Sequence, residues 1–136
     1  MDRLQSTYAP ALGRLLIAIL FVGAGFGKLM APMAGTVGYI ASVGLPLPEL
    51  GYAIALIVEL GGGILLLIGF GTRYVALVLA AFCLFTAFVF HGFGDMNNQI
   101  QAMKNFAIAG GLLFVFANGA GAWSVDALRG PKLAMA

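Results

Sequence analysis

The sequence predicts an all-α integral membrane protein built as a bundle of four transmembrane helices. Of its 136 residues, 62% are hydrophobic and only 9% are charged, whereas an ordinary soluble domain carries roughly 25% charged residues. The apolar residues form long runs, and a run of roughly 20 residues is enough to cross a bilayer once. A chain of this length has room for a single membrane domain, covering residues 1–136.

Four apolar runs qualify as membrane spans, and they cover about residues 11–30, 50–70, 74–90 and 103–122. The first follows Pro10, which suits the first turn of a helix because its missing N–H needs no partner there. Residues 71–73 leave a very short turn, so the second and third spans should form an antiparallel hairpin. Residues 31–49 hold a weakly amphipathic piece followed by two prolines, which predicts a short interfacial or re-entrant segment. Residues 91–98 are rich in Gly, Asn and Asp and predict a loop.

The distribution of basic residues predicts the orientation of the chain. With four spans, both termini and the short turn lie on the same side of the membrane. That side carries Arg3, Arg14, Arg73, Arg129 and Lys132, and the opposite side carries Lys28 and Lys104. Because basic residues are enriched in cytoplasmic segments, we expect both termini to lie in the cytoplasm.

One charged residue lies deep inside the second span. Glu59 is near the middle of the apolar stretch from Leu50 to Phe70, which holds no other charge. A carboxylate at that depth costs roughly 3 kcal/mol on insertion scales, so it must be protonated, paired or turned toward a polar interior. We therefore expect Glu59 to face the inside of the bundle and to take part in any function.

Helical spacing places the polar residues of each span on one face. Residues three and four positions apart share one side of a helix, and faces that carry polar groups should point into the bundle. These faces are Arg14, Ala18, Phe21, Gly25 and Lys28 in the first span; Tyr52, Leu56, Glu59, Gly63 and Leu66 in the second; Ala76, Ala80, Cys83, Ala87 and His91 in the third; and Lys104, Ile108, Gly111, Val115 and Asn118 in the fourth.

The depth of each residue suggests the partner of Glu59. At the helical rise, Glu59 lies roughly 15 Å from the outer side, and a fourth helix that starts near Asn97 places Lys104 roughly 10 Å deep. We therefore expect Glu59 to pair with Lys104, with Lys28 nearby. Arg14 lies on the inner side, and its long side chain should extend to the cytoplasmic interface.

The same residues also have structural interpretations. Glu59 with one lysine could be only a tie between helices, and Lys28 could be an interfacial anchor. A lone His91 without ligand partners in suitable spacing predicts no metal site, and Cys83 in apolar surroundings should be an unreactive packing residue. The glycines at 61–63 would loosen the helix and leave space for a flat ligand beside Glu59.

Several short motifs follow one another along the chain. They are Gly13-Arg14-Leu15-Leu16, Gly27-Lys28-Leu29, Gly44-Leu45-Pro46, Glu59-Leu60-Gly61-Gly62-Gly63, Phe90-His91-Gly92-Phe93 and Lys104-Asn105. With these motifs, the chain resembles the DoxX family of small bacterial inner-membrane proteins from about residue 10 to residue 128. The resemblance implies a four-helix bundle in the bacterial inner membrane. Because the family name comes from the small subunit of a thiosulfate:quinone oxidoreductase, it also implies a link to quinone-related redox systems.

The resemblance assigns no catalytic role, so whether the chain is an enzyme stays open. Arg14, Lys28, Glu59 and Lys104 match the family pattern, with His91 beside them. We expect Glu59, Lys104, Lys28 and His91 to line a cofactor-binding site. A quinone-like carrier is the candidate cofactor.

Three functions compete at this point. The first is a redox-associated inner-membrane subunit that binds a quinone-like carrier near Glu59. The second is a non-catalytic anchor or assembly subunit for membrane or soluble redox proteins, because the chain lacks the residue patterns of known catalytic sites. The third is a conduit for protons or small solutes, since a buried acid suits proton coupling, and a homo-oligomer would give it more room. The net charge of +2 is too small and scattered to suggest nucleic acid.

Overall fold

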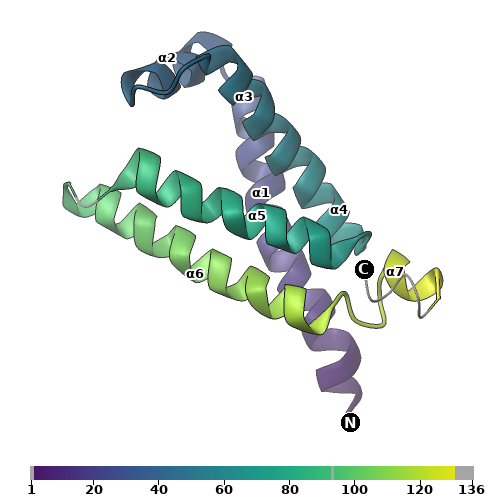
Figure 1. Cartoon of the computed structure of the whole chain (residues 1–136). Coiled ribbons are helices and arrows are strands. Elements are labelled where there is room, and N and C mark those ends of the chain that lie inside the picture. Colours follow the sequence, from purple (N-terminus) through teal and green to yellow (C-terminus); the bar gives the residue numbers. More distant parts are fainter. Residues whose placement is uncertain (1, 93, 131–136) are drawn as a thin grey trace.

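The computed structural model describes residues 2–92 and 94–130, and all regular elements in these ranges are helical (Figure 1). In chain order they are η1 (Leu4–Tyr8), α1 (Ala9–Met30), α2 (Met33–Ser42), α3 (Pro48–Leu56), η2 (Ile57–Gly62), α4 (Gly63–Ile68), α5 (Thr72–Thr86), η3 (Ala87–His91), α6 (Met96–Asn118) and α7 (Val125–Leu128), where η marks a π-helical segment. Phe93 and Lys132, which enter the sequence predictions, lie outside the described residues.

Four continuous helical stretches are long and apolar enough to cross a membrane, which confirms the predicted all-α architecture. They run over Leu4–Met30, Pro48–Ile68, Thr72–His91 and Met96–Asn118. The first and fourth begin several residues earlier than predicted, because apolar content marks only part of a helix that continues through polar residues. Asp95 sets the start of α6, since its side chain accepts a hydrogen bond from the Asn98 N–H and so caps the helix.

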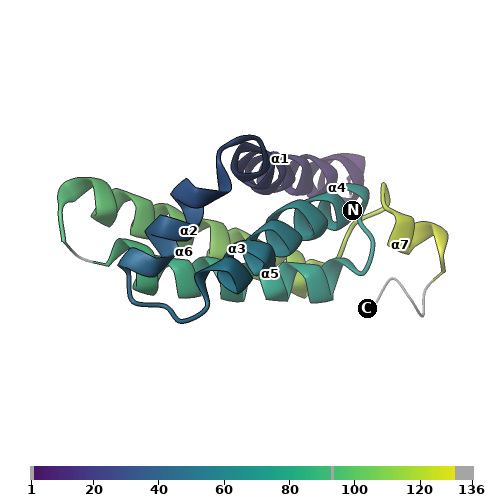
Figure 2. The same ribbon diagram turned by 90° about the horizontal axis from the view of Figure 1, so that it is seen from above.

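The spans form two hairpins that meet at one end and diverge at the other (Figure 1). In one hairpin α1 packs against η2 and α4, and in the other α5 packs against α6. We call the end with the turn between α4 and α5 the closed end, and the short helix α7 lies beside that turn. At the opposite, open end, α2 projects sideways between the ends of α1 and α3 (Figure 2). The predicted interfacial segment is therefore a short helix.

Glycines allow the helices of the first hairpin to pack closely. A Cβ atom on Gly25 would lie 2.7 Å from Cγ of Leu60, and one on Gly63 would lie 2.9 Å from Cγ2 of Val22. Larger residues there would push the two helices apart. A large cavity lies between the two hairpins, and the glycines at 61–63 do not line it. The prediction that they leave space for a ligand is therefore wrong.

The predicted buried faces are confirmed in three spans and wrong in the fourth. In the first three spans the faces are buried, apart from Lys28, Leu56 and His91, which are half-buried. In α6 the buried residues are Ala102, Ala109 and Leu112, whereas Lys104 and Asn118 are exposed. The predicted face was chosen because it contains the charged Lys104. The face that packs is instead the one that carries Ala102, Ala109 and Leu112.

Arg14 joins the helices at the closed end and is only 2% exposed. Its Nε donates to the carbonyl of Ala120 at 2.9 Å, and its Nη1 donates to the carbonyls of Leu66 and Leu67, both at 2.9 Å. Its Nη2 donates to the carbonyl of Trp123. These carbonyls lie at or beyond the ends of α4 and α6, where helical partners run out. The prediction that Arg14 extends to the cytoplasmic interface is therefore wrong.

Asp126, in the short helix α7, caps α5 at the same end. Its Oδ1 accepts a hydrogen bond from the N–H of Gly71 at 2.8 Å, and its Oδ2 accepts one from the N–H of Thr72 at 2.9 Å. Its own N–H donates to the carbonyl of Gly69 at 2.9 Å. The first N–H groups of a helix have no partner within it. A carboxylate from the end of the chain supplies that partner here.

Replacing Arg14 with lysine should destabilise the protein. Lysine keeps the positive charge but cannot serve four carbonyls with one planar group. Because a hydrogen bond to a charged group contributes about 1.5–3 kcal/mol, we expect Arg14→Lys to lower the free energy of unfolding by about 2 kcal/mol or more. Equilibrium unfolding in mixed detergent micelles, followed by circular dichroism, measures this loss.

Arg73→Lys provides the matched control for this substitution. Arg73 is also bonded to helix-end carbonyls, but it is half-buried and bonded through Nη1 alone, at 3.0 Å from Phe116 O and 3.1 Å from Ala117 O. Its replacement should cost clearly less than that of Arg14. Equal losses in the two variants would contradict the role of Arg14 at the closed end.

Asp126 should make the stability fall at acid pH. Burial acts to raise the pKa of Asp126, but the hydrogen bonds from Thr72 and Gly71 and the charge of Arg129 outweigh it, so that this pKa lies below its usual value. The stabilisation is therefore complete above the unfolded pKa of about 3.9 and is lost as the pH falls through the folded pKa. We expect the unfolding temperature of Asp126→Asn in detergent to be lower at neutral pH and to fall less than that of wild type below about pH 4. An equally steep fall in both proteins would exclude Asp126 as the source.

Candidate functional site

A cavity of about 690 Å³ lies where the two hairpins diverge. It is bounded by α1, α2, α3, η2, α5, η3, α6 and the turn before α3. Its walls are mainly apolar and include Leu20, Phe21, Leu50, Ile54, Phe82 and Phe85. Ligand pockets in proteins span roughly 300–1,000 Å³ and are similarly apolar with a few placed polar groups. The cavity is therefore large enough for a small apolar molecule.

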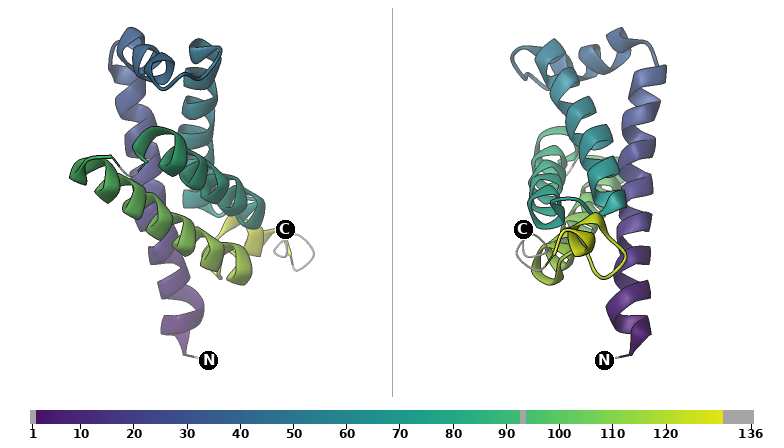
Figure 3. Two further views of the ribbon diagram at one scale, coloured as in Figure 1. Left: turned by 60° about the vertical axis from the view of Figure 1, so that its left-hand side comes forward. Right: turned by 90° about the vertical axis from the view of Figure 1, so that its right-hand side faces the viewer.

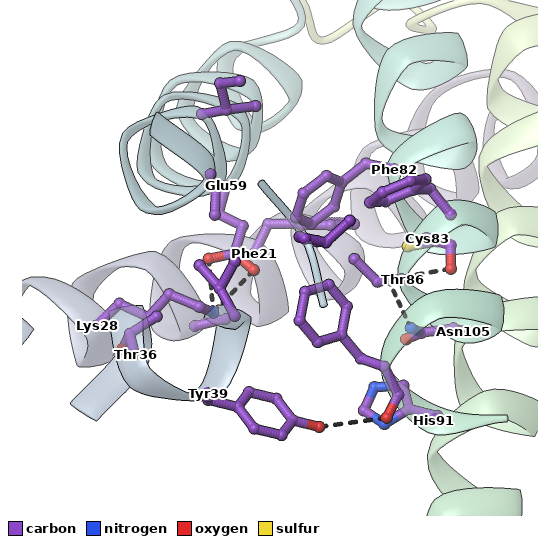
Figure 4. Close-up of a pocket in the computed structure, with 18 of the residues that line it drawn as sticks. Phe21, Lys28, Thr36, Tyr39, Glu59, Phe82, Cys83, Thr86, His91 and Asn105 are labelled. Carbon is purple, nitrogen blue, oxygen red and sulfur yellow. Dashed lines mark hydrogen bonds and ion pairs between the residues drawn. The ribbon is translucent and has the colours of Figure 1, made fainter. Parts of the chain in front are cut away.

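An ion pair forms one side of this cavity (Figure 4). Lys28 Nζ lies 2.8 Å from Oε2 and 3.0 Å from Oε1 of Glu59. The Glu59 side chain is 8% exposed, whereas that of Lys28 is 30% exposed. An ammonium group has three hydrogens to donate, so one remains beyond the two directed at Glu59. A ligand in the cavity can accept that hydrogen.

The observed partner of Glu59 is Lys28, so the predicted pair with Lys104 is wrong. Because α1 packs against η2, with Gly25 at the close approach, Lys28 on the next turn of α1 reaches the carboxylate. Lys104 is exposed and donates to Gln101 Oε1 at 3.0 Å. Gln101 lines the cavity and Lys104 does not. The prediction compared depths in the membrane, which do not tell which helices are neighbours.

Two π-helical turns carry polar residues of the cavity. Glu59 lies in η2, and His91 ends η3. Such turns widen a helix locally, are rare in proteins and often occur at functional sites. The segment η2 interrupts the second span between α3 and α4, whereas η3 ends the third span after α5.

The cavity is bridged at the open end by a contact between α2 and η3. Tyr39 Oη donates to the carbonyl of Phe90 at 3.2 Å, and the two ring centroids lie 5.4 Å apart. His91, beside them, also lines the cavity. Its Nδ1 is buried and has no hydrogen-bond partner among the residues that the structure describes. Tyr39 was not predicted as a cavity residue, because nothing in the sequence pattern places α2 over η3.

Asn105 and Thr86 lie on the opposite side of the cavity from the ion pair (Figure 4). Asn105 Nδ2 donates to Thr86 Oγ1 at 2.9 Å, and Thr86 Oγ1 donates to the carbonyl of Cys83 at 3.1 Å. No role was predicted for Asn105. A signal was present, because Ala102, Asn105, Ala109 and Leu112 follow helical spacing and define the face of α6 that packs inward.

Three of the four predicted cofactor-binding residues thus line one cavity. Lys28, Glu59 and His91 contribute to its walls, and Lys104 approaches it only through Gln101. Within residues 2–92 and 94–130, no group of three or more His, Cys, Asp or Glu side chains could hold a metal ion. The arrangement combines apolar walls with a charged donor and acceptor on one side and a neutral amide on the other. It can hold a flat apolar molecule that carries hydrogen-bonding oxygens.

Comparison with known proteins identifies the family. The DoxX family model matches residues 9–92, which includes Lys28, Glu59 and His91 but not α6. "Inner membrane protein YqjF" of Escherichia coli (strain K12) is 43% identical over 122 residues, covering 88% of this chain and 90% of the relative. "Inner membrane protein YphA" of the same organism is 37% identical over 121 residues, covering 85% and 86%. No solved structure matches the chain. With four helices able to span a membrane and inner-membrane relatives, this is a multi-pass inner-membrane protein, and it belongs to the DoxX family.

Proposed function

We propose that the chain binds a quinone-like carrier in the cavity and acts as a redox-associated subunit of the inner membrane. The observation that carries this proposal is the Lys28–Glu59 pair on the side of an otherwise apolar cavity of about 690 Å³. Leucine and phenylalanine side chains would hold the ring of the carrier. The remaining hydrogen of the Lys28 ammonium would donate to a carbonyl oxygen of the ring, a charge-assisted bond stronger than a neutral one.

The ion pair suits both redox forms of such a carrier. An oxidised ring presents carbonyl oxygens, which accept hydrogen bonds, and Lys28 is a donor. A reduced ring presents hydroxyl groups, which donate, and each carboxylate oxygen of Glu59 can accept more than one hydrogen bond. A protein that exchanges a carrier with the membrane must bind both forms.

The structure gives less support to an anchor or assembly role. Basic residues at the closed end would be the contacts for a soluble partner in that role. Arg73 donates instead to two carbonyls at the end of α6, and Arg129 lies 4.7 Å from the ring centroid of Phe70. Lys132 lies outside the described residues. Partner proteins and a homo-oligomer therefore remain secondary proposals.

A conduit for protons or solutes is also less well supported. A path from the cavity to the other side would have to pass the closed end. Arg14 and the carbonyls bonded to it fill that end, with Asp126 beside them.

We infer that both termini lie in the cytoplasm, which would place the cavity in the outer half of the membrane. The excess of basic residues on the side of the termini supports this orientation. The only native cysteine, Cys83, is buried, so introduced cysteines can be labelled selectively. In intact cells, an impermeant maleimide should label Gly94→Cys and should label Arg129→Cys only after the membrane is opened. The reverse pattern would contradict the inferred orientation.

Native mass spectrometry of gently extracted, untagged protein tests the carrier-binding proposal. Wild type should retain a quinone-sized ligand, and Glu59→Gln and Lys28→Met should lose most of it. Loss of one charge-assisted bond should lower the affinity about tenfold or more. Lys104→Met, which removes a lysine outside the cavity, should retain the ligand.

Two results would contradict the proposal. If wild type retains no ligand and shows no saturable binding of added quinone, the carrier-binding role is wrong. If Lys104→Met loses the ligand while Lys28→Met retains it, the ion pair is not part of the site.

A further inference from the structure

We propose that Asn105 forms a second polar contact in the cavity, so that the ligand is a flat ring with an oxygen at each of two opposite ends. This inference rests on the proposed carrier site and names the chemical class that fits it. Lys28 and Glu59 would hold one oxygen of the ring, and Asn105 would hold the other. Figure 4 shows these groups on opposite sides of the cavity.

The hydrogen bonds of Thr86 determine how the Asn105 amide is turned. A threonine hydroxyl has one hydrogen to donate, and Thr86 Oγ1 donates it to the carbonyl of Cys83 at 3.1 Å. Toward Asn105 the hydroxyl can therefore only accept, so its partner at 2.9 Å must be the Nδ2 group and not Oδ1. Among residues 2–92 and 94–130 the Asn105 side chain has no other hydrogen bond, so Oδ1 and the second Nδ2 hydrogen can serve a ligand.

The surroundings of Asn105 also point to a ligand at this side. Asn105 and His91 line the same cavity, and among the described residues the buried Nδ1 of His91 has no hydrogen-bond partner. Buried polar atoms without a partner are rare in native structures. Because this nitrogen is enclosed by protein, a ligand oxygen beside Asn105 would satisfy it only after the His91 ring turns toward the cavity.

The two sides of the cavity share one chemical property. Lys28 with Glu59 offers a donor and an acceptor, and Asn105 offers a donor and an acceptor as well. Each side can thus bind a carbonyl oxygen of an oxidised ring or a hydroxyl group of a reduced ring. A lipid or ketone with one polar end would leave one side unpartnered, so it should bind more weakly.

A pair of probes that differ by one oxygen tests this inference. We would titrate the full chain in lipid nanodiscs, without oxygen in the buffer, with 2-methyl-1,4-naphthalenediol, which has an oxygen at both ends of the ring, and with 2-methyl-1-naphthol, which is equally flat and has one. A neutral hydrogen bond contributes about three- to tenfold in affinity. Wild type should therefore bind the first probe at least about threefold more tightly than the second. Asn105→Leu should remove this difference by weakening the binding of the first probe alone.

Matched variants separate a binding role from a structural one. Thr86→Val removes the hydroxyl that orients Asn105 and should reduce the difference between the probes, whereas Thr86→Ser keeps the hydroxyl and should preserve it. Asn118→Leu makes the same amide-to-leucine change on α6 at an exposed position outside the cavity. It should leave both affinities within about twofold of wild type.

The outcomes distinguish this inference from the proposed function. If wild type binds both probes equally well and Glu59→Gln weakens both, the carrier site stands and the second contact at Asn105 is wrong. The second contact is also wrong if Asn105→Leu weakens both probes equally or neither. If neither probe shows saturable binding to wild type, the proposed function fails and this inference fails with it.

Discussion

The arrangement of the whole bundle depends on the buried guanidinium of Arg14. Inside a membrane no water is available to hydrogen-bond the carbonyls at helix ends, so the protein itself must supply donors. Arg14 supplies them from α1 to Leu66, Leu67, Ala120 and Trp123, at the ends of α4 and α6. Asp126 does the converse for the N–H groups that begin α5. All four spans thus meet at one polar junction, which holds the two hairpins together at the closed end.

The open end follows from this junction. Because the hairpins are held together at one end, they can diverge at the other without coming apart, and Figure 3 shows this divergence from two further directions. The separation leaves a cavity lined by apolar side chains and a few polar ones. Tyr39 reaches from α2 to Phe90 across the open end, so the short helix completes the enclosure that the spans leave unfinished.

The sequence was sufficient to predict local features of the fold, because they depend on residues close together in the chain. Apolar runs predicted the four spans, and helical spacing predicted which face of each of the first three is buried. The partners of Glu59 and Arg14 depend on which helices are neighbours, which spacing within one helix does not reveal. Lys104 has suitable depth but lies on the exposed face of α6, and the carbonyls of Ala120 and Trp123 lie more than a hundred positions from Arg14. Asn105 was overlooked because a charged residue, one position away, drew the prediction to the wrong face.

Arg14 is a cation with a purely structural role in this protein, and Lys28 differs from it in its exposure to the cavity. Arg14 is 2% exposed and is bonded through all three of its nitrogens. The Lys28 side chain is instead 30% exposed at the side of an apolar cavity, where one of its hydrogens is available. That exposure leaves the ammonium group open to a ligand, as the proposed function requires.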